Sequence, residues 1–200
     1  MGVDPRRGDQ IVRGAAVLPH GTGRAVRVCV FAGVDQAEAA KAAGADRVGS
    51  QDLVDAILRD GPKAIDFDAV VATPDQMPML SKAGRVLGPR GLMPNPKTGT
   101  VTQDPAGAVA QLKQGRAEFR VDKHGHIHGG VGPAASDPAK LEDNVCAFVS
   151  AVADAKPPGA KGTPLSPLYI RQCYVATTFG RGYNVALPSL FDAVKRFRAQ

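Results

Sequence analysis

Between residues 26 and 88, short apolar runs alternate with stretches suited to helices, and this alternation limits the possible folds more than any other feature. Residues 26–32 and 67–73 are rich in β-branched side chains, which is typical of strands covered on both faces. A shorter strand is expected at 47–49. Helices are expected at 37–43, at 52–58 with Asp52 as its N-cap, and at 77–87. This order predicts right-handed crossovers and a small parallel sheet, a Rossmann-like unit.

After residue 100 the pattern changes. A helix at 105–114 is expected to precede two short strands, 118–121 and 127–131, joined by a "DKHG" turn in which Gly125 suits a positive φ. Asp137 and Pro138 are typical of a helix start, and this helix should run to about residue 155. A long strand is expected at 168–178 and a short one at 183–187. Because this antiparallel mixture differs from the parallel unit, we expect two domains.

Basic charge is concentrated at the two ends of the chain. Residues 1–31 carry five arginines against two aspartates, and residues 161–200 carry six lysines and arginines against one aspartate. The net charge of the whole sequence is +6. A basic excess of this kind is typical of a nucleic-acid partner, because cationic side chains replace the counterions of phosphates. The alternative at this point is an enzyme with a basic isoelectric point.

Several other classes of function lack support in the sequence. No apolar run approaches the roughly 20 residues needed to span a bilayer, so we expect a soluble protein without membrane contacts. Cys29, Cys146 and Cys173 are far apart and lie among apolar neighbours, which predicts buried thiols and neither a disulfide framework nor a zinc cluster. We expect no cofactor and no small-molecule substrate.

The stretch "LGPRGLMPNPKTGT", residues 87–100, comes close to the pattern of a phosphate-binding loop. Such a loop aims consecutive backbone N–H groups at phosphate oxygens, and Pro89, Pro94 and Pro96 have none to offer. Asp66, Asp68 and Asp75 lie beside a parallel strand, where α/β enzymes often keep acids, but without a nucleophile they are better read as helix caps and solvated charges. We therefore expect no catalytic residues.

The "HGHIH" segment places three histidines at alternate positions of an extended chain, a spacing suited to metal ligands. They are His124, His126 and His128. His124, however, lies in the predicted turn, which breaks the common face, and no carboxylate or cysteine has an evident role as a further ligand. We therefore interpret these histidines as exposed or RNA-facing and expect no metal site.

Six segments, taken in order along the chain, carry a specific resemblance. They are "GVDPRRGDQIVRGAAVLPHGTGRAVRVCVFA" (2–32), "AAGADRVG" (42–49), "DFDAVVATPD" (66–75), "LGPRGLMPNPKTGTV" (87–101), "EFRVDKHGHIH" (118–128) and "AKG…ATTFG" (160–180). In them the sequence resembles the family of large-subunit ribosomal protein number one, the protein of the mobile stalk beside the tRNA exit site. The resemblance is to the bacterial and organellar branch.

This resemblance implies a fold of two domains. One is an antiparallel α+β, rRNA-binding domain built from both chain ends, here residues 1–22 plus 113–200. The other is an inserted Rossmann-like parallel α/β domain, here 23–112. The family's two hinges map near Gly21 and Gly23 and near Gly115. The family normally has a helix and a strand ahead of "GVDPRR", so we expect either a misassigned start or a shortened protein.

The resemblance also implies the RNA-binding residues. The family's signature, a Thr-Met-Gly triplet at the end of the last long strand, is matched by Thr178, Phe179 and Gly180, preceded by Thr177. Glycine allows the RNA backbone to approach, and threonine offers a hydroxyl. Phe179 replaces the methionine and Gln172 a common serine, although an aromatic ring still suits a sugar or base. Further candidates for phosphate contacts are Arg13, Arg120, Lys123, His128, Lys161 with Gly162, and, less strongly, Arg90 and Lys97. For each of them, an ordinary solvated charge is the alternative.

Residues 188–200 extend past the family's usual end. Leu190, Phe191, Val194 and Phe197 follow helical spacing, so we expect a helix that docks on the terminal domain and adds phosphate contacts through Lys195, Arg196 and Arg198.

Together these observations predict a structural ribosomal protein that binds large-subunit rRNA at the stalk helices and assists release of deacylated tRNA from the exit site. In bacteria, binding to its own mRNA as a translational repressor is also implied. The expected location is the ribosome, in a bacterial cytoplasm, plastid or mitochondrion. The alternatives are a nucleotide-dependent α/β enzyme and a non-ribosomal RNA-binding regulator.

Overall fold

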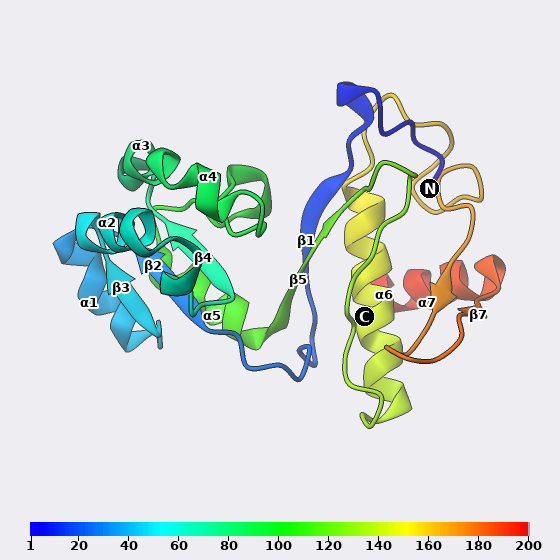
Figure 1. The fold of residues 1–200 in the computed structure, drawn as a ribbon. Coiled ribbons are helices and arrows are strands. Elements are labelled where there is room, and N and C mark those ends of the chain that lie inside the picture. The colour runs from blue at the N-terminus through cyan, green and yellow to red at the C-terminus, as the bar shows by residue number, and fades with distance from the viewer. Residues whose placement is uncertain (200) are drawn as a thin grey trace. The chain divides into compact units, whose positions relative to one another are not determined.

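The computed structural model describes residues 1–199, without the side chains of Val34, Asp35, Pro62 and Lys97. It is a mixed α/β chain that divides into two compact units (Figure 1). Unit 1 combines Met1–Gly23 with Gly115–Gln200, and unit 2 is Arg24–Gln114. In the described part of the chain, no helix is both long and apolar enough to cross a membrane.

Unit 2 is built around a three-stranded parallel sheet. Its strands are β3 (Arg47–Gly49), β2 (Val28–Phe31) and β4 (Ala69–Ala72), in that spatial order. All four residues of β2 are buried, as expected for a central strand covered on both faces. A parallel bridge between Ala72 and Val101 extends the sheet beside β4.

Helices cover both faces of this sheet (Figure 1). On one face Val28 and Val30 share an apolar cluster with α1 (Val34–Ala42) and α5 (Pro105–Gly115). On the other face Cys29 and Phe31 do so with α2, α3 and α4. These three helices span Gln51–Asp60, Met77–Lys82 and Gly84–Leu87. The alternation along β2 therefore supplies both halves of the core.

Unit 1 pairs its two chain segments through a two-stranded antiparallel ribbon. Strand β1 (Arg13–Val17) and β5 (Arg116–Arg120) place Arg13 opposite Arg120. Helix α6 (Pro138–Asp154) packs against this ribbon, and α7 (Leu187–Ala199) packs against α6. A short hairpin of β6 (Tyr174–Val175) and β7 (Tyr183–Asn184) precedes α7. Turns of 3-10 helix complete the chain: η1 (Gly8–Gln10), η2 (Gly61–Ala64), η3 (Pro74–Gln76) and η4 (Pro96–Thr98).

The long strand expected at 168–178 is wrong. Only Tyr174 and Val175 pair as strand residues, whereas Tyr169 and Ile170 are buried side chains that follow a turn closed by the Ser166 carbonyl. The apolar residues of this segment are therefore explained by burial in the core, and not by pairing with a neighbouring strand. The strand expected at 127–131 shrinks in the same way to one bridge, between Val121 and Ile127.

Two helix boundaries also differ from expectation. Ser50, and not Asp52, occupies the N-cap position of α2, and no side-chain hydrogen bond caps that helix. The helix expected at 77–87 is divided at Ala83 into α3 and α4, immediately before Gly84. Glycine is a poor helix former, which fits an interruption at this point. By contrast, Asp137 caps α6 as expected, accepting a hydrogen bond from the Ala139 backbone N–H at 3.1 Å.

Candidate nucleic-acid interface

The turn between β6 and β7 presents the predicted signature to solvent. Thr177, Thr178, Phe179 and Gly180 are all exposed, and the Phe179 side chain is 102% exposed relative to its reference. The backbone N–H of Gly180 donates to the Thr177 carbonyl at 3.2 Å, closing the turn. A Cβ atom at position 180 would meet only the hydroxyl of the Thr177 side chain, which would have to rotate away.

The same hairpin exposes two tyrosines that the sequence analysis did not single out. Tyr174 is 56% exposed and Tyr183 is 62% exposed, and the Arg181 guanidinium lies 5.3 Å from the centre of the Tyr183 ring. An exposed aromatic ring next to an arginine is a suitable platform for an RNA base. The sequence signal was the "RGY" that follows the turn, since a tyrosine on a two-residue strand has no second sheet to cover it.

A second group of cations lies on the β1–β5 ribbon. Arg13 and Arg120 are directly opposite each other in the register, so their side chains share one face. Glu118 lies on this face as well, and its partial desolvation raises its pKa, against the lowering effect of Arg116 and Arg13. Desolvation lowers the pKa of Arg116, whose Nε is buried without a hydrogen-bond partner among the described residues.

The turn that follows β5 holds Lys123 and His128, both exposed. Asp122 organises it: Oδ1 of Asp122 accepts hydrogen bonds from the backbone N–H groups of His124 and His126, each at 2.8 Å. The bond from His126 is the main cause of the lowered pKa of Asp122. Gly125 adopts a φ of 80°, as expected for this turn.

Lys161 and Gly162 lie in an exposed loop after α6. Gly162 has a φ of 80°, and a Cβ atom there would lie 2.7 Å from Cβ of Leu168. Lys161 forms no ion pair with any described residue. The loop is therefore tightly folded and leaves one cation directed to solvent.

The three glycines expected at the hinges all have positive φ: 66° at Gly21, 69° at Gly23 and 109° at Gly115. Asn144 of α6 fixes the first of these segments. Its Nδ2 donates to the carbonyls of Gly21 at 2.9 Å and Val131 at 2.8 Å, and its Oδ1 accepts from the His20 backbone N–H at 3.1 Å. Asn144 is only 2% exposed, so its amide group supplies the hydrogen bonds that water would otherwise make to these backbone groups.

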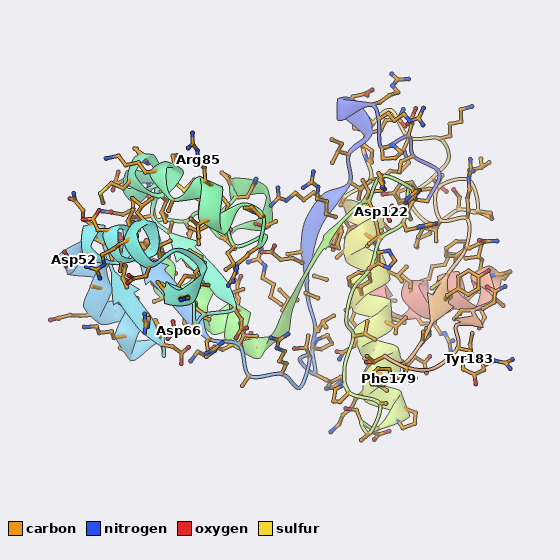
Figure 2. The ribbon with its side chains drawn as sticks, viewed as in Figure 1. Asp52, Asp66, Arg85, Asp122, Phe179 and Tyr183 are labelled. Atoms are coloured by element: carbon orange, nitrogen blue, oxygen red, sulfur yellow. The ribbon has the colours of Figure 1, made fainter. Side chains whose placement is uncertain are left out.

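Within unit 1 the candidates lie on several segments: the β1–β5 ribbon with the turn that follows it, the loop of Lys161, and the turn between β6 and β7. Asp122, which marks the 122–128 turn, lies near the end of α6, whereas Phe179 lies toward the start of that helix (Figure 2). Arg13 and Arg120 are paired on the ribbon, and Lys161 with Gly162 stand on a loop of their own. An RNA that contacts all of them must extend along this unit.

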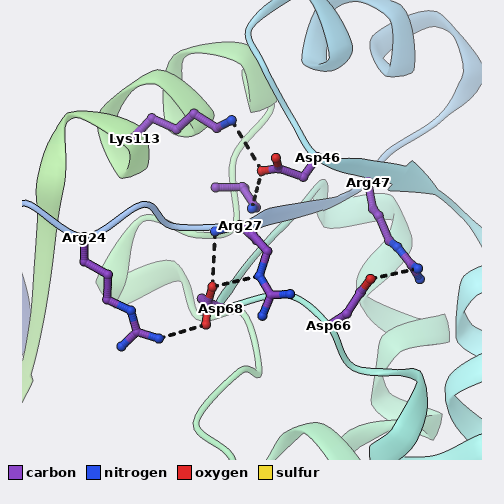
Figure 3. A network of polar contacts seen from close by, with 8 residues as sticks. Arg24, Arg27, Asp46, Arg47, Asp66, Asp68 and Lys113 are labelled. Atoms are coloured by element: carbon purple, nitrogen blue, oxygen red, sulfur yellow. Dashed lines mark hydrogen bonds and ion pairs between the residues drawn. The ribbon is translucent and has the colours of Figure 1, made fainter.

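Two of the acids beside the parallel strand, Asp66 and Asp68, are engaged in ion pairs (Figure 3). Asp66 pairs with Arg47 at 2.8 Å, and Asp68 pairs with Arg24 at 3.1 Å and Arg27 at 3.2 Å. Asp66 and Asp68 therefore cap no helix: they are loop charges, partly exposed to solvent, that pair with arginines on neighbouring segments. Asp75 lies in the first turn of η3.

The stretch at 87–100 is a compact structural connection. The hydroxyls of Thr98 and Thr100 are buried, lie 3.1 Å apart and bond to the backbone of Asn95. Gly91 and Gly99 take positive φ values of 71° and 63°. The chain then leads directly into the bridge at Val101. Arg90 is exposed, and the side chain of Lys97 lies outside the described residues.

These features define a class: a basic mixed α/β protein whose exposed turns carry cations and aromatic rings suited to RNA. Comparison with known families specifies it further. The chain belongs to the ribosomal protein L1p/L10e family, whose model matches residues 1–181 of the 200. This is a family of structural ribosomal proteins, so the chain is a large-subunit ribosomal protein that binds rRNA, and it is not an enzyme.

Proposed function

We propose that unit 1 binds the stalk helices of large-subunit rRNA, with the 177–180 turn as its main contact. The observation that carries this proposal is the complete exposure of Phe179 on a turn closed by the hydrogen bond from the Gly180 N–H to the Thr177 carbonyl. Because the ring is fully exposed, RNA binding need not break any packing of this side chain within the protein. The ring can stack on a base or sugar. The hydroxyls of Thr177 and Thr178 stand beside it for ribose or phosphate.

Basic side chains on other segments of unit 1 then hold the RNA backbone. Arg13, Arg120, Lys123, His128 and Lys161 all belong to unit 1. Phosphate contacts of this kind fix the position of the RNA, whereas the aromatic turn reads its unpaired bases. The affinity should fall steeply with salt because each phosphate contact releases a counterion.

The finer role that we propose is at the exit site. Gly21, Gly23 and Gly115 lie where the chain passes between the two units and serve as the hinges. Motion about them helps the stalk to follow deacylated tRNA as it leaves. Ribosomes depleted of this chain should release deacylated tRNA more slowly, and adding the chain back should restore the rate; an unchanged rate would argue against this role.

The location that we propose is the ribosome of a bacterium, plastid or mitochondrion. In a bacterial source the chain also binds a similar structure in its own mRNA and represses translation. Translation of a reporter that carries this mRNA structure should then decrease as the level of the protein rises.

The direct test of RNA binding is the substitution Phe179→Ala. Loss of one stacked ring should weaken binding to a stalk rRNA fragment by about tenfold, because stacking contributes ~1–3 kcal/mol per base. Leu58→Ala is the matched control, since Leu58 is also an exposed apolar side chain, at 47%, and lies on α2, which carries none of the proposed contacts. Filter binding or fluorescence anisotropy at several salt concentrations measures both variants. Equal affinities of the two variants would exclude the turn as the main contact.

A further inference from the structure

The turn after β5 brings together three potential metal ligands. They are Asp122, His126 and His128, whose ligand atoms all lie within 4.8 Å of one another. Asp122 Oδ2 is 3.7 Å from His126 Nδ1 and 3.7 Å from His128 Nε2. Ligands at tetrahedral zinc are about 3.4 Å apart when each bond is about 2.0–2.1 Å. Small side-chain rotations would therefore bring all three to bonding distance of one ion.

The backbone of the turn fixes this arrangement. Ile127 is part of the apolar packing of unit 1 and bridges to Val121, so its side chain faces inward. The residues on either side of it, His126 and His128, consequently point outward together. A hydrogen bond from the Asp122 N–H to the His126 carbonyl at 2.9 Å also holds the backbones of these two residues together.

The carboxylate is oriented before any ion arrives. Asp122 Oδ1 accepts two backbone hydrogen bonds, which leaves Oδ2 directed at both imidazole rings. Bonds of this kind to a ligand fix its direction and raise metal affinity. The Asp122 side chain is 34% exposed, and those of His126 and His128 are 64% and 79% exposed, so an ion could enter directly from solvent and keep one or more waters.

We propose that Asp122, His126 and His128 form a binding site for a divalent transition metal ion, with zinc as the best match. Two imidazole nitrogens and one carboxylate oxygen are a typical three-ligand set for zinc, and the fourth position is left to water. From the sequence alone no metal site was expected, because His124, the third histidine of the segment, lies in the turn. Asp122, four residues before His126, is the carboxylate that completes the ligand set.

This inference does not rest on the proposed RNA contacts, although His128 is a candidate for both. Metal binding is measured on the protein alone, so its failure would leave the rRNA proposal intact. Conversely, loss of RNA binding in the Phe179 variant would say nothing about the ion.

The test is a zinc titration of the full chain without an affinity tag, followed by isothermal calorimetry. We expect one zinc ion per chain. His126→Ala, His128→Ala and Asp122→Asn should each weaken binding by about tenfold or more, since even supporting partners of metal ligands contribute 10–100-fold. Asp122→Asn keeps an oxygen for the two backbone N–H groups and removes only the charge.

His124→Ala and His20→Ala are the matched controls. His124 belongs to the same turn but not to the ligand set, and His20 is an exposed histidine beside Asp143 at 3.0 Å. Both should retain zinc affinity within about twofold. Circular dichroism verifies that every variant is folded. The proposal is overturned if zinc does not bind at millimolar concentration, or if His126→Ala binds as tightly as the unchanged chain.

Discussion

At the scale of single residues, Gly115 connects local geometry with the proposed motion. Its φ of 109° is one that side chains other than glycine rarely adopt, and a Cβ atom there would collide with Cα of Gly21. The two segments proposed as hinges are therefore in direct contact within unit 1. The Leu18 N–H donates to the Gly115 carbonyl at 3.2 Å, which adds a hydrogen bond at the same place.

Gly115→Ala should destabilise the protein by about 1–3 kcal/mol from backbone strain alone, with the steric overlap adding to it. Gly84→Ala is the control, because a Cβ atom at Gly84 meets nothing within 4 Å. That change should be neutral or stabilising, by up to about 1 kcal/mol. Urea unfolding of both variants measures the difference; equal stabilities would refute the close packing at Gly115.

At the scale of elements, α7 shows where sequence reasoning succeeds. The spacing of its apolar residues predicted a docked helix, and Leu190, Phe191 and Val194 are indeed buried against the core of unit 1. Amphipathic spacing is a local property, so it survives without knowledge of the partner. Arg198 bonds to α6, to the Ser150 carbonyl at 3.0 Å and to Asp154 at 2.6 Å, whereas, among the described residues, Lys195 and Arg196 bond only to Asp192 of their own helix.

Deleting residues 189–200 should lower the melting temperature by about 10 °C or more, because each buried apolar side chain contributes roughly 1.5–3 kcal/mol. Lys195→Ala serves as the control, since Lys195 and its partner Asp192 are both largely exposed and such a pair contributes about 0–1 kcal/mol. A scanning-calorimetry profile unchanged by the deletion would show that α7 does not support the core.

Other elements show what the sequence could not supply. The run from Leu168 resembles a strand because Tyr169 and Ile170 are apolar. Both side chains are instead buried in the core that includes α6, where the Tyr169 hydroxyl donates a hydrogen bond to the Val152 carbonyl at 3.1 Å. Periodicity reports which side chains are buried and not whether a neighbouring strand exists. The exposed ring of Tyr183 beside Arg181 and the position of Asp122 beside two histidines could not be predicted for a related reason, since both depend on how turns fold back.

At the scale of the whole molecule, two aspartates connect the start of unit 2 to the rest of it (Figure 3). Asp46 Oδ2 accepts from the Val28 N–H at 2.9 Å and pairs with Lys113 at 3.3 Å. Asp68 does the same for Arg27 and Arg24. The backbone hydrogen bonds, from Val28 and Arg27, are the main reason why the pKa of each carboxyl lies below its ordinary value of 3.8.

A lowered pKa in the folded state means that the stabilisation is present above pH 4 and is lost as the pH falls through the folded-state pKa. Asp46→Asn should therefore be less stable than the unchanged chain at pH 7, by up to about 1 kcal/mol for so exposed a group. The difference should close toward pH 3. Urea unfolding at pH 7, 5 and 3 measures it, with Asp55→Asn as the control on an exposed helical position. A difference that persists at low pH would contradict this account.

The carboxylate of Asp46 has a consequence for how such a chain can be taken apart. It holds the beginning of β2 and the end of α5 at one point, so residues 24–114 start and finish side by side. A segment whose ends are adjacent can be deleted from a longer chain, or circularly permuted, without distorting the backbone on either side of the junction. Residues 24–114 can therefore be deleted from the gene as one continuous segment, or expressed by themselves.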